Sequence, residues 1–303
     1  MSNAEKYRII QDPDYGYRRL DPIPNEREIT KFYQSQYYNL VRKGKRAPDV
    51  HKLMTDGEEA DREHSWLSSS LYSDILAVLE QKGNLISKRL LDIGCGTGEF
   101  IAFMKQHGWE VVGLELSSEG IAIAKSKGLE VYNLSIEEFL SKYPQYSSTF
   151  NIVTLLHVLE HIPNPVEFLS LVKNLLTNTG MIVIQVPNDF NELQLAAQKQ
   201  LNKKPWWIAI PDHINYFDFR SLHALLERLG FKVIHSQGSF PMELFLLMGD
   251  DYVGNPEVGS KCHQKRVRFE TAIPGELRRR IYVALAEIGV GRDCLVFAEV
   301  KRE

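Results

Sequence analysis

The stretch Leu91–Gly98, which reads LDIGCGTG, decides the fold of this chain. It carries an acid, Asp92, near the end of an apolar run, followed by three glycines at alternate positions. The apolar residues predict a buried strand over 89–93, and their grouping after the glycines predicts a helix over 98–107. Glycines at such a turn let the backbone bend tightly and let a ligand approach the main chain. The stretch therefore predicts a strand–turn–helix unit with a ligand at its turn.

A second acid, Glu115, ends the next expected strand, 110–115, and lies 21 residues after Gly94. A carboxylate at about this spacing binds ribose hydroxyls in nucleotide-binding α/β folds. A dinucleotide fingerprint would need its third glycine at Glu99, where an acid would face a pyrophosphate. A loop preceded by Asp92 instead suits a nucleoside ligand that is positively charged and lacks phosphates. The sequence thus disfavours an NAD-dependent dehydrogenase.

Strand and helix patterns alternate along the chain beyond this unit. In order, the expected elements are helix 117–127, strand 129–133, helix 135–142, strand 150–156, helix 165–176, strand 180–186, helix 221–230, strand 231–235 and strand 294–300. Ser117 has the position of a helix N-cap, and Ser135 with Glu138 has the spacing of a capping box. This alternation predicts an α/β fold with a doubly wound, mostly parallel sheet and helices on both faces.

Composition excludes several other classes of protein. The 303 residues include 36 Lys+Arg and 39 Asp+Glu, a net charge of −3, and 44% are hydrophobic. This is ordinary globular composition, and it lacks the basic excess of a general nucleic-acid or membrane-surface binder. Three separated cysteines suit a reducing cytoplasm, and no apolar run is long enough to span a bilayer. The first four residues lack the features of a signal peptide, so we expect a cytoplasmic protein. We also expect a monomer or a homodimer.

The glycine stretch resembles motif I of the class I (Rossmann-like) S-adenosylmethionine (SAM)-dependent methyltransferases of the small-molecule type. Further segments resemble that family in the same order: VVGLELS (111–117), SIE (135–137), TLLHVLEHIPNP (154–165) and GMIVIQVP (180–187). The resemblance covers roughly residues 70–240 and the terminal strand. It implies a seven-stranded sheet whose last strand is antiparallel, and SAM as the cofactor.

The resemblance also implies a division of the chain. The expected parts are an N-terminal helical or lid segment (1–85), a SAM-binding Rossmann-like domain (86–240), an accessory insertion on the substrate side (241–292) and a terminal strand (293–303). Within the insertion, residues 255–280 hold seven Lys/Arg and three Glu. The simpler interpretation is a solvated helical face, and the alternative is a patch that receives an anionic substrate.

The cofactor-binding residues implied by the resemblance are Asp92, Gly94, Cys95, Gly96, Gly98, Glu115, Leu116, Ser135, Ile136, Leu156 and His157. Glu115 would accept both ribose hydroxyls, and Asp92 would face the ammonium group. Leu116 and Ile136 would enclose the adenine. Asn133 stands where the family often has Asp, so the adenine amino group would meet the Ser135 hydroxyl or a backbone carbonyl instead. Cys95 is expected to be a small packing residue, because methyl transfer from a sulfonium needs no covalent intermediate.

Candidate catalytic bases follow the fourth strand and precede the 221–230 helix. His161 is the preferred general base, and His213 is the second candidate. The alternatives are structural roles: the His161 side chain would cap its loop, and a hydrogen bond of His213 would order the loop that carries it. Some O-methyltransferases hold a divalent ion with Glu/His residues at the positions of His157, Glu160 and His161. Because His157 stands where a carboxylate would be expected, we expect no metal.

Candidate acceptor-binding residues are mostly aromatic: Tyr33, Tyr37, Tyr38, Asn188, Trp206, Trp207 and Tyr216. The adjacent tryptophans lie in an insertion, 190–211, and would form an aromatic wall or lid, with packing of an accessory helix as the alternative. The tyrosines resemble an N-terminal aromatic helix that closes over SAM, with an amphipathic core helix as the alternative.

The expected function is in-line transfer of the sulfonium methyl group to oxygen or nitrogen, less readily to carbon, of a small-molecule acceptor, with a histidine as general base. Two alternatives remain open. One is methylation of a macromolecule such as RNA or protein, which the near-neutral charge disfavours. The other is a non-catalytic SAM-binding subunit, because an intact loop indicates binding and not turnover.

Overall fold

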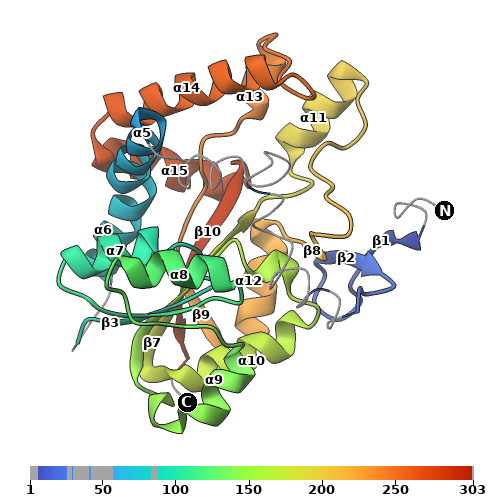
Figure 1. Ribbon diagram of the computed structural model, residues 1–303. Coiled ribbons are helices and arrows are strands. Elements are labelled where there is room, and N and C mark those ends of the chain that lie inside the picture. Colours follow the sequence, from blue (N-terminus) through green and yellow to red (C-terminus); the bar gives the residue numbers. More distant parts are fainter. Residues whose placement is uncertain (1–5, 26–28, 30–40, 42–56, 83–86, 302–303) are drawn as a thin grey trace. The chain divides into compact units, whose positions relative to one another are not determined.

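A seven-stranded sheet is the main feature of the computed structural model, which describes residues 6–25, 29, 41, 57–82 and 87–301 (Figure 1). Its strands, in spatial order, are β5 (Val131–Tyr132), β4 (Glu110–Leu114), β3 (Arg89–Ile93), β6 (Phe150–Leu156), β7 (Leu176–Pro187), β10 (Asp293–Val300) and β9 (Phe231–Gln237). β3 pairs in parallel with β4 and β6, β4 pairs in parallel with β5, and β10 is antiparallel to β9. The expected mostly parallel sheet with an antiparallel terminal strand is therefore confirmed.

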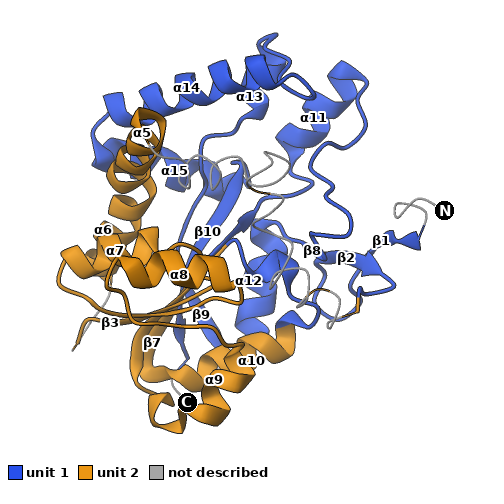
Figure 2. Ribbon diagram, viewed as in Figure 1, with its two compact units in different colours: residues 1–24, 157–165, 184–301 blue, residues 25–156, 166–183, 302–303 orange. Residues whose placement is uncertain are grey.

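The described chain divides into two compact units (Figure 2). Unit 1 comprises residues 1–24, 157–165 and 184–301, and unit 2 comprises residues 25–156, 166–183 and 302–303. Each unit takes separated stretches of the sequence. No described helix is both long and apolar enough to cross a membrane.

Unit 2 contains the glycine stretch and the strands around it. Its helical elements are α5 (Glu58–Leu67), the π-helical turn η1 (Ser68–Tyr72), α6 (Ser73–Lys82), α7 (Glu99–Gln106), α8 (Ser118–Ser126), α9 (Ile136–Lys142), the 3-10 turn η2 (Pro144–Tyr146) and the main part of α10 (Pro165–Leu175). Within this unit, α7 and α8 lie on one side of the strands, and α9 and α10 lie on the other (Figure 2). The strands are almost wholly buried, as parallel strands covered on both faces must be.

Two helix starts follow the expected side-chain chemistry. Ser117 caps α8 by accepting a hydrogen bond from the Gly120 amide. Ser135 and Glu138 form the predicted capping box at α9: the hydroxyl accepts from the Glu138 amide, and the carboxylate accepts from the Ser135 amide. Both caps satisfy amides that have no partner within the helix.

The first described elements of unit 1 are strands, whereas the helices of the expected helical or lid segment (1–85) that the structure describes are α5, η1 and α6 of unit 2. β1 (Arg8–Gln11) and β2 (Arg18–Asp21) form an antiparallel hairpin, and β8 (Asn215–Tyr216) pairs with β2. Asp12 builds the turn, because its carboxylate accepts hydrogen bonds from the Asp14 and Tyr15 amides. Burial of Tyr7 and Leu20 against Tyr216 then favours a strand over a helix.

The remaining elements of unit 1 are η3 (Leu159–His161), α11 (Glu192–Leu201), α12 (Phe219–Arg228), α13 (Glu243–Leu247), α14 (Pro256–Ala272) and α15 (Gly275–Glu287). α12 starts earlier than expected, because Asp218 rather than Ser221 is its N-cap.

The basic stretch 255–280 falls on α14 and α15, and much of its charge is engaged within the protein. Buried Arg266 contacts Glu270 at 3.1 Å, and buried Arg278 donates to the Glu270 carbonyl. Lys261 and Lys265 pair with Glu257 and Asp250. These contacts favour a structural role over an anion-binding patch for the four residues.

Candidate active site

The glycine turn between β3 and α7 has a backbone that only glycine adopts readily. Gly94, Gly96 and Gly98 have φ angles of 76°, 54° and 82°, all in the left-handed region. The amides of Gly94 and Cys95 both donate to the Leu114 carbonyl, at 2.8 and 2.9 Å, which ties the turn to β4. The turn therefore presents main chain, rather than side chains, at the amino end of α7.

Asp92 is buried at the end of β3, with 3% of its surface exposed. The Thr154 hydroxyl on β6 donates to Asp92 Oδ1 at 2.5 Å. Burial raises the pKa of Asp92 to about 7; the Thr154 hydrogen bond opposes this, and the charge of Glu115 adds to it. A cationic ligand beside this carboxyl would favour its ionised form.

Glu115 directly follows β4 and lies against the glycine turn. Its Oε2 accepts a hydrogen bond from the Gly96 amide at 3.0 Å, and its Oε1 accepts one from the Ser117 amide at 2.7 Å. Burial raises the pKa of Glu115, although these amide hydrogen bonds oppose the effect. The Asn133 side chain donates to the Glu115 carbonyl at 2.8 Å. Both carboxylate oxygens are thus oriented, and each retains acceptor capacity for a hydroxyl group.

The other expected cofactor residues of unit 2 lie on or near the same strand ends. Cys95 is buried, and burial raises the pKa of its thiol well above the usual value, as suits a packing residue. Ile136 is also buried, Leu116 and Leu156 are half-buried, and the Ser135 hydroxyl is occupied as the α9 cap. The carboxylates and the open turn suit a ligand with hydroxyls and positive charge, so the described residues fit SAM chemically.

The chain leaves β6 at His157, where a non-glycine residue adopts a positive φ of 58°. The His157 amide donates to the Gln185 carbonyl at 2.8 Å, and its Nδ1 lies 3.2 Å from Glu160 Oε1. A left-handed backbone at such a residue is uncommon and costs free energy, and such residues cluster at functional sites. The backbone bend brings the His157 ring to the Glu160 carboxylate.

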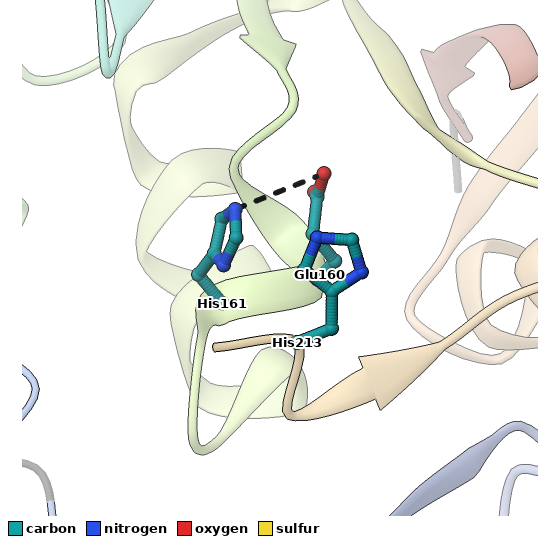
Figure 3. Close-up of side chains that lie close together, drawn as sticks. All are labelled: Glu160, His161 and His213. Atoms are coloured by element: carbon teal, nitrogen blue, oxygen red, sulfur yellow. Dashed lines mark ion pairs between the residues drawn. The ribbon is translucent and has the colours of Figure 1, made fainter. Parts of the chain in front are cut away.

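Glu160, His161 and His213 form a compact cluster within unit 1 (Figure 3). One ligand-type atom from each lies within 4.8 Å of the other two, and His161 Nε2 is 3.9 Å from Glu160 Oε1. The two imidazoles meet edge to face with their centroids 5.1 Å apart. Two histidines that the sequence placed in separate segments are therefore neighbours of one carboxylate.

Glu160 is 1% exposed and ionised. Burial alone would raise its pKa, but the hydrogen bond from His157 and the nearby imidazoles of the cluster lower it to about 2. From the sequence, Glu160 was one of the polar residues after the fourth strand and a member of the alternative metal set, but not the preferred base. Its charge makes it the electrostatic centre of the cluster.

The loop that carries His213 is held by its neighbours. The Ile214 amide donates to the Glu160 carbonyl at 2.8 Å, and buried Asn215 donates to the carbonyls of Leu159 and Ile162 at 3.2 and 2.7 Å. Asn215 thus joins the two segments of the cluster. Sequence reasoning missed this role, because no local pattern reveals which distant carbonyls an asparagine will meet.

The expected acceptor residues are only partly brought together. Trp207 meets Trp206 and Phe190 edge to face, with centroids 5.0 and 5.6 Å apart, and Phe190 meets Tyr216 at 6.0 Å. Asn188 is fully buried and donates to the carbonyls of Gly289 and Gly291, which indicates a structural role for its amide nitrogen. The remaining candidates, Tyr33, Tyr37 and Tyr38, lie outside the described residues.

Two buried acidic residues of unit 1 were not predicted from the sequence as site residues. Asp189 and Glu243 are 2% and 3% exposed, and burial raises the pKa of both carboxyls. Asp189 directly follows the Asn188 singled out from the sequence, whereas nothing in the local sequence marks Glu243. Their proximity is a product of tertiary structure.

The sheet order and the glycine turn are those of the class I SAM-dependent methyltransferases. A family model described as a methyltransferase domain matches residues 62–236, which is more than half of the sequence. The chain belongs to this methyltransferase domain family.

Curated relatives match part of the chain. The ubiquinone biosynthesis O-methyltransferase of Photorhabdus laumondii is 28% identical over 139 residues, which cover 44% of this chain and 52% of that protein. The protein of the same name from Glaesserella parasuis is 33% identical over 121 residues, covering 37% and 51%. The chain thus spans about half the length of the curated relatives it matches.

Among solved structures, a Burkholderia thailandensis 1,6-didemethyltoxoflavin-N1-methyltransferase, determined with 1,6-didemethyltoxoflavin and S-adenosylhomocysteine, is similar in fold. Its TM-score is 0.53 at 14% identity, and the match covers 98% of this chain and all of that one.

Proposed function

We propose that this chain transfers the methyl group of SAM to an oxygen of a small-molecule acceptor. The observation that carries the proposal is the oriented carboxylate of Glu115, held by the Gly96 amide beside a turn of left-handed glycines. Oxygen is favoured over nitrogen and carbon, because the curated relatives are O-methyltransferases.

Glu115 is proposed to accept hydrogen bonds from both ribose hydroxyls, a charge-assisted contact. Asp92 is proposed to balance the positive charge of the ligand, directly or through water, and Leu116 with Ile136 to contact the adenine. SAM, when bound, supplies an activated methyl group. The protein must then align the acceptor, exclude water and accept a proton.

His161 is the proposed general base. Its Nδ1 donates to the Asp212 carbonyl at 2.8 Å, so in the neutral ring Nε2 is the basic nitrogen. The ionised Glu160 nearby stabilises the imidazolium that forms. His213 beside it is the second candidate for the same step.

Ligand binding is tested by thermal unfolding of the protein with SAM, S-adenosylhomocysteine or NAD. We expect the first two to raise the melting temperature and NAD to leave it unchanged. Glu115→Gln should lose the stabilisation by SAM, whereas Glu110→Gln, at the other end of β4, should keep it. Stabilisation by NAD alone would contradict the proposal.

Methyl transfer is tested with a panel of hydroxyl-bearing and amine-bearing small molecules, followed by mass spectrometry of the products. We expect a gain of one methyl group on hydroxyl-bearing acceptors. Methylation confined to amines would contradict the choice of oxygen. In a parallel assay with RNA and protein as acceptors, methylation of these alone would support the macromolecular alternative.

A further inference from the structure

Two buried carboxyls of unit 1, those of Asp189 and Glu243, have no role in the proposed proton transfer. Asp189 Oδ2 and Glu243 Oε2 are buried and accept no hydrogen bond from any described residue. A buried carboxyl with an unpaired oxygen costs free energy that a bound donor would recover. We propose that Asp189 and Glu243, together with the Tyr216 hydroxyl, bind a cationic amino group of the methyl acceptor. The proposal rests on the proposed function, because it takes the ligand to be that acceptor.

Both carboxyls lie beside the side-chain amide of Gln194. Gln194 Oε1 accepts a hydrogen bond from the Phe190 amide at 2.7 Å, so the NH2 end of the group is the end that can serve the carboxyls. Burial raises the pKa of Asp189 and of Glu243, and hydrogen bonding by Gln194 opposes the effect at each. α11, which carries Gln194, packs against α13, which carries Glu243 (Figure 1). One NH2 group has two hydrogens, so the four carboxyl oxygens offer more acceptors than it can satisfy.

A buried hydroxyl adds a third unpaired oxygen. Tyr216 is 1% exposed, and its Oη has no hydrogen-bond partner among the described residues. Burial raises the pKa of this hydroxyl, and the charge of Asp189 raises it further, so the two groups lie near each other. The Ala209 amide is near enough to oppose this rise but lies outside hydrogen-bonding geometry. The three unpaired oxygens provide one acceptor for each N–H of a primary ammonium group.

The charges around Asp189 favour a cation over an anion. Besides burial, the charges of Glu160, Asp293 and Glu243 raise its pKa. The charge of Arg292 acts in the opposite direction at Glu243. An ammonium group among these acids would be attracted and would favour their ionised forms, whereas a carboxylate or phosphate would be repelled. The site therefore suits a cationic acceptor, in contrast to the anionic one considered from the sequence.

The position of Asp189 suits recognition of an acceptor. It lies two residues after the end of β7, and open α/β sheets bind ligands at the carboxyl ends of their strands. The next residue, Phe190, has a φ of 60°, and non-glycine residues with such a backbone cluster at functional sites. Glu160, whose charge acts on Asp189, belongs to the histidine cluster. An acceptor held by its amino group at Asp189 would therefore have its hydroxyl group available to the histidine base.

Charge selectivity is tested on the unmodified full chain by calorimetric titration in the presence of S-adenosylhomocysteine. Tyramine and dopamine carry an ammonium group, 4-ethylphenol and 4-ethylcatechol lack it, and 3-(4-hydroxyphenyl)propionate carries a carboxylate instead. We expect each amine to bind at least about 10-fold more tightly than its uncharged counterpart, and the propionate to bind most weakly. No preference for the amines, or binding by none of these compounds, would overturn the proposal.

Two variants assign the selectivity to the acids. Asp189→Asn and Glu243→Gln keep the shape of each side chain and remove its charge, so the affinity for tyramine should fall roughly 10- to 150-fold. Affinity for 4-ethylphenol should stay unchanged. Glu257→Gln is the matched control, because this glutamate is exposed at the start of α14 in the same unit, and it should bind both compounds normally.

An equal loss of affinity for tyramine and 4-ethylphenol would show that the acids act only through the fold, and it would overturn the proposal. Unchanged binding of tyramine by both variants would do the same. For a variant that does not fold, the comparison of the amines with their uncharged counterparts on the unmodified protein decides.

The two proposals fail separately. Preferential binding of the amines, without methyl transfer from SAM to any acceptor, would contradict the proposed function and leave the amine site standing. Methyl transfer to 4-ethylphenol and 4-ethylcatechol with the same kcat/KM as to tyramine and dopamine would leave the proposed function standing and remove the amine site.

Discussion

The Gly96 amide donates a hydrogen bond to Glu115 Oε2 at 3.0 Å, so the glycine turn itself orients the acid at the end of the neighbouring strand. The Ser117 amide holds the other carboxylate oxygen at 2.7 Å. A left-handed glycine and an acid 19 residues later thus form one structural element. The orientation of the Glu115 carboxylate therefore depends on the geometry of the glycine turn.

Replacement of Glu115 by Ala should weaken SAM binding. Hydrogen bonds to a charged group contribute about 1.5–3 kcal/mol, so we expect the dissociation constant to rise roughly 10- to 150-fold. Isothermal titration calorimetry with SAM measures the change, and Glu110→Ala on the same strand should bind as the unmodified protein does. Equal affinity of the two variants would remove Glu115 from the cofactor site.

Gly98→Ala should destabilise the fold more than Gly108→Ala. Both glycines have φ of +82°, so both variants carry the left-handed strain, about 1–2 kcal/mol. A Cβ on Gly98 would lie 2.5 Å from Leu129 Cδ1, whereas one on Gly108 would meet nothing within 4 Å. Overpacking costs about 1–3 kcal/mol more. The difference between the two variants in urea unfolding measures the free-energy cost of this overpacking. Equal urea midpoints for the two variants would show that Leu129 moves aside at no cost.

The affinity for SAM should depend on pH through Asp92. Its pKa is raised from 3.8 to about 7 in the folded protein, so the neutral form is favoured when no ligand is bound. The stability that this group contributes is fully present below pH 3.8 and is lost as the pH rises through about 7. Binding of a cation favours the ionised form, and binding below pH 7 must therefore release a proton.

We accordingly expect affinity for SAM to increase as the pH rises from 5.5 to about 7 and then to level off. Calorimetry in buffers of different ionisation enthalpy counts the protons released. Asp92→Asn should bind more weakly and show no such dependence; a pH dependence unchanged in this variant would assign the proton to another group.

His161→Ala should lower the rate of methyl transfer and leave SAM binding unchanged. General-base catalysis contributes roughly 10²- to 10⁴-fold, so we expect kcat to fall within that range. An unchanged kcat with a reduced rate in His213→Ala would transfer the role to His213.

The sequence by itself determined the strands and helix starts that depend on residues close together in the chain. Strands β3 and β6 lie where their apolar runs predicted, and α8 and α9 start at their predicted serine caps. These features depend on residues a few positions apart, so a pattern in the sequence is enough to reveal them. The sequence also revealed the glycine turn and Glu115, because each directly follows a predicted strand.

Only the tertiary structure decided which distant groups meet. In the β1–β2 hairpin, Tyr7 and Leu20 pack against Tyr216, about 200 residues further along the chain, and no local pattern in the sequence predicted this hairpin. His213 lies beside Glu160 because the next two residues, Ile214 and Asn215, donate hydrogen bonds to backbone carbonyls of the segment that carries Glu160. Such contacts depend on loop closure and on the pairing of buried polar groups, and neither leaves a periodic trace in the sequence. The local sequence thus determined the glycine turn, and long-range hydrogen bonding decided the composition of the histidine–glutamate cluster.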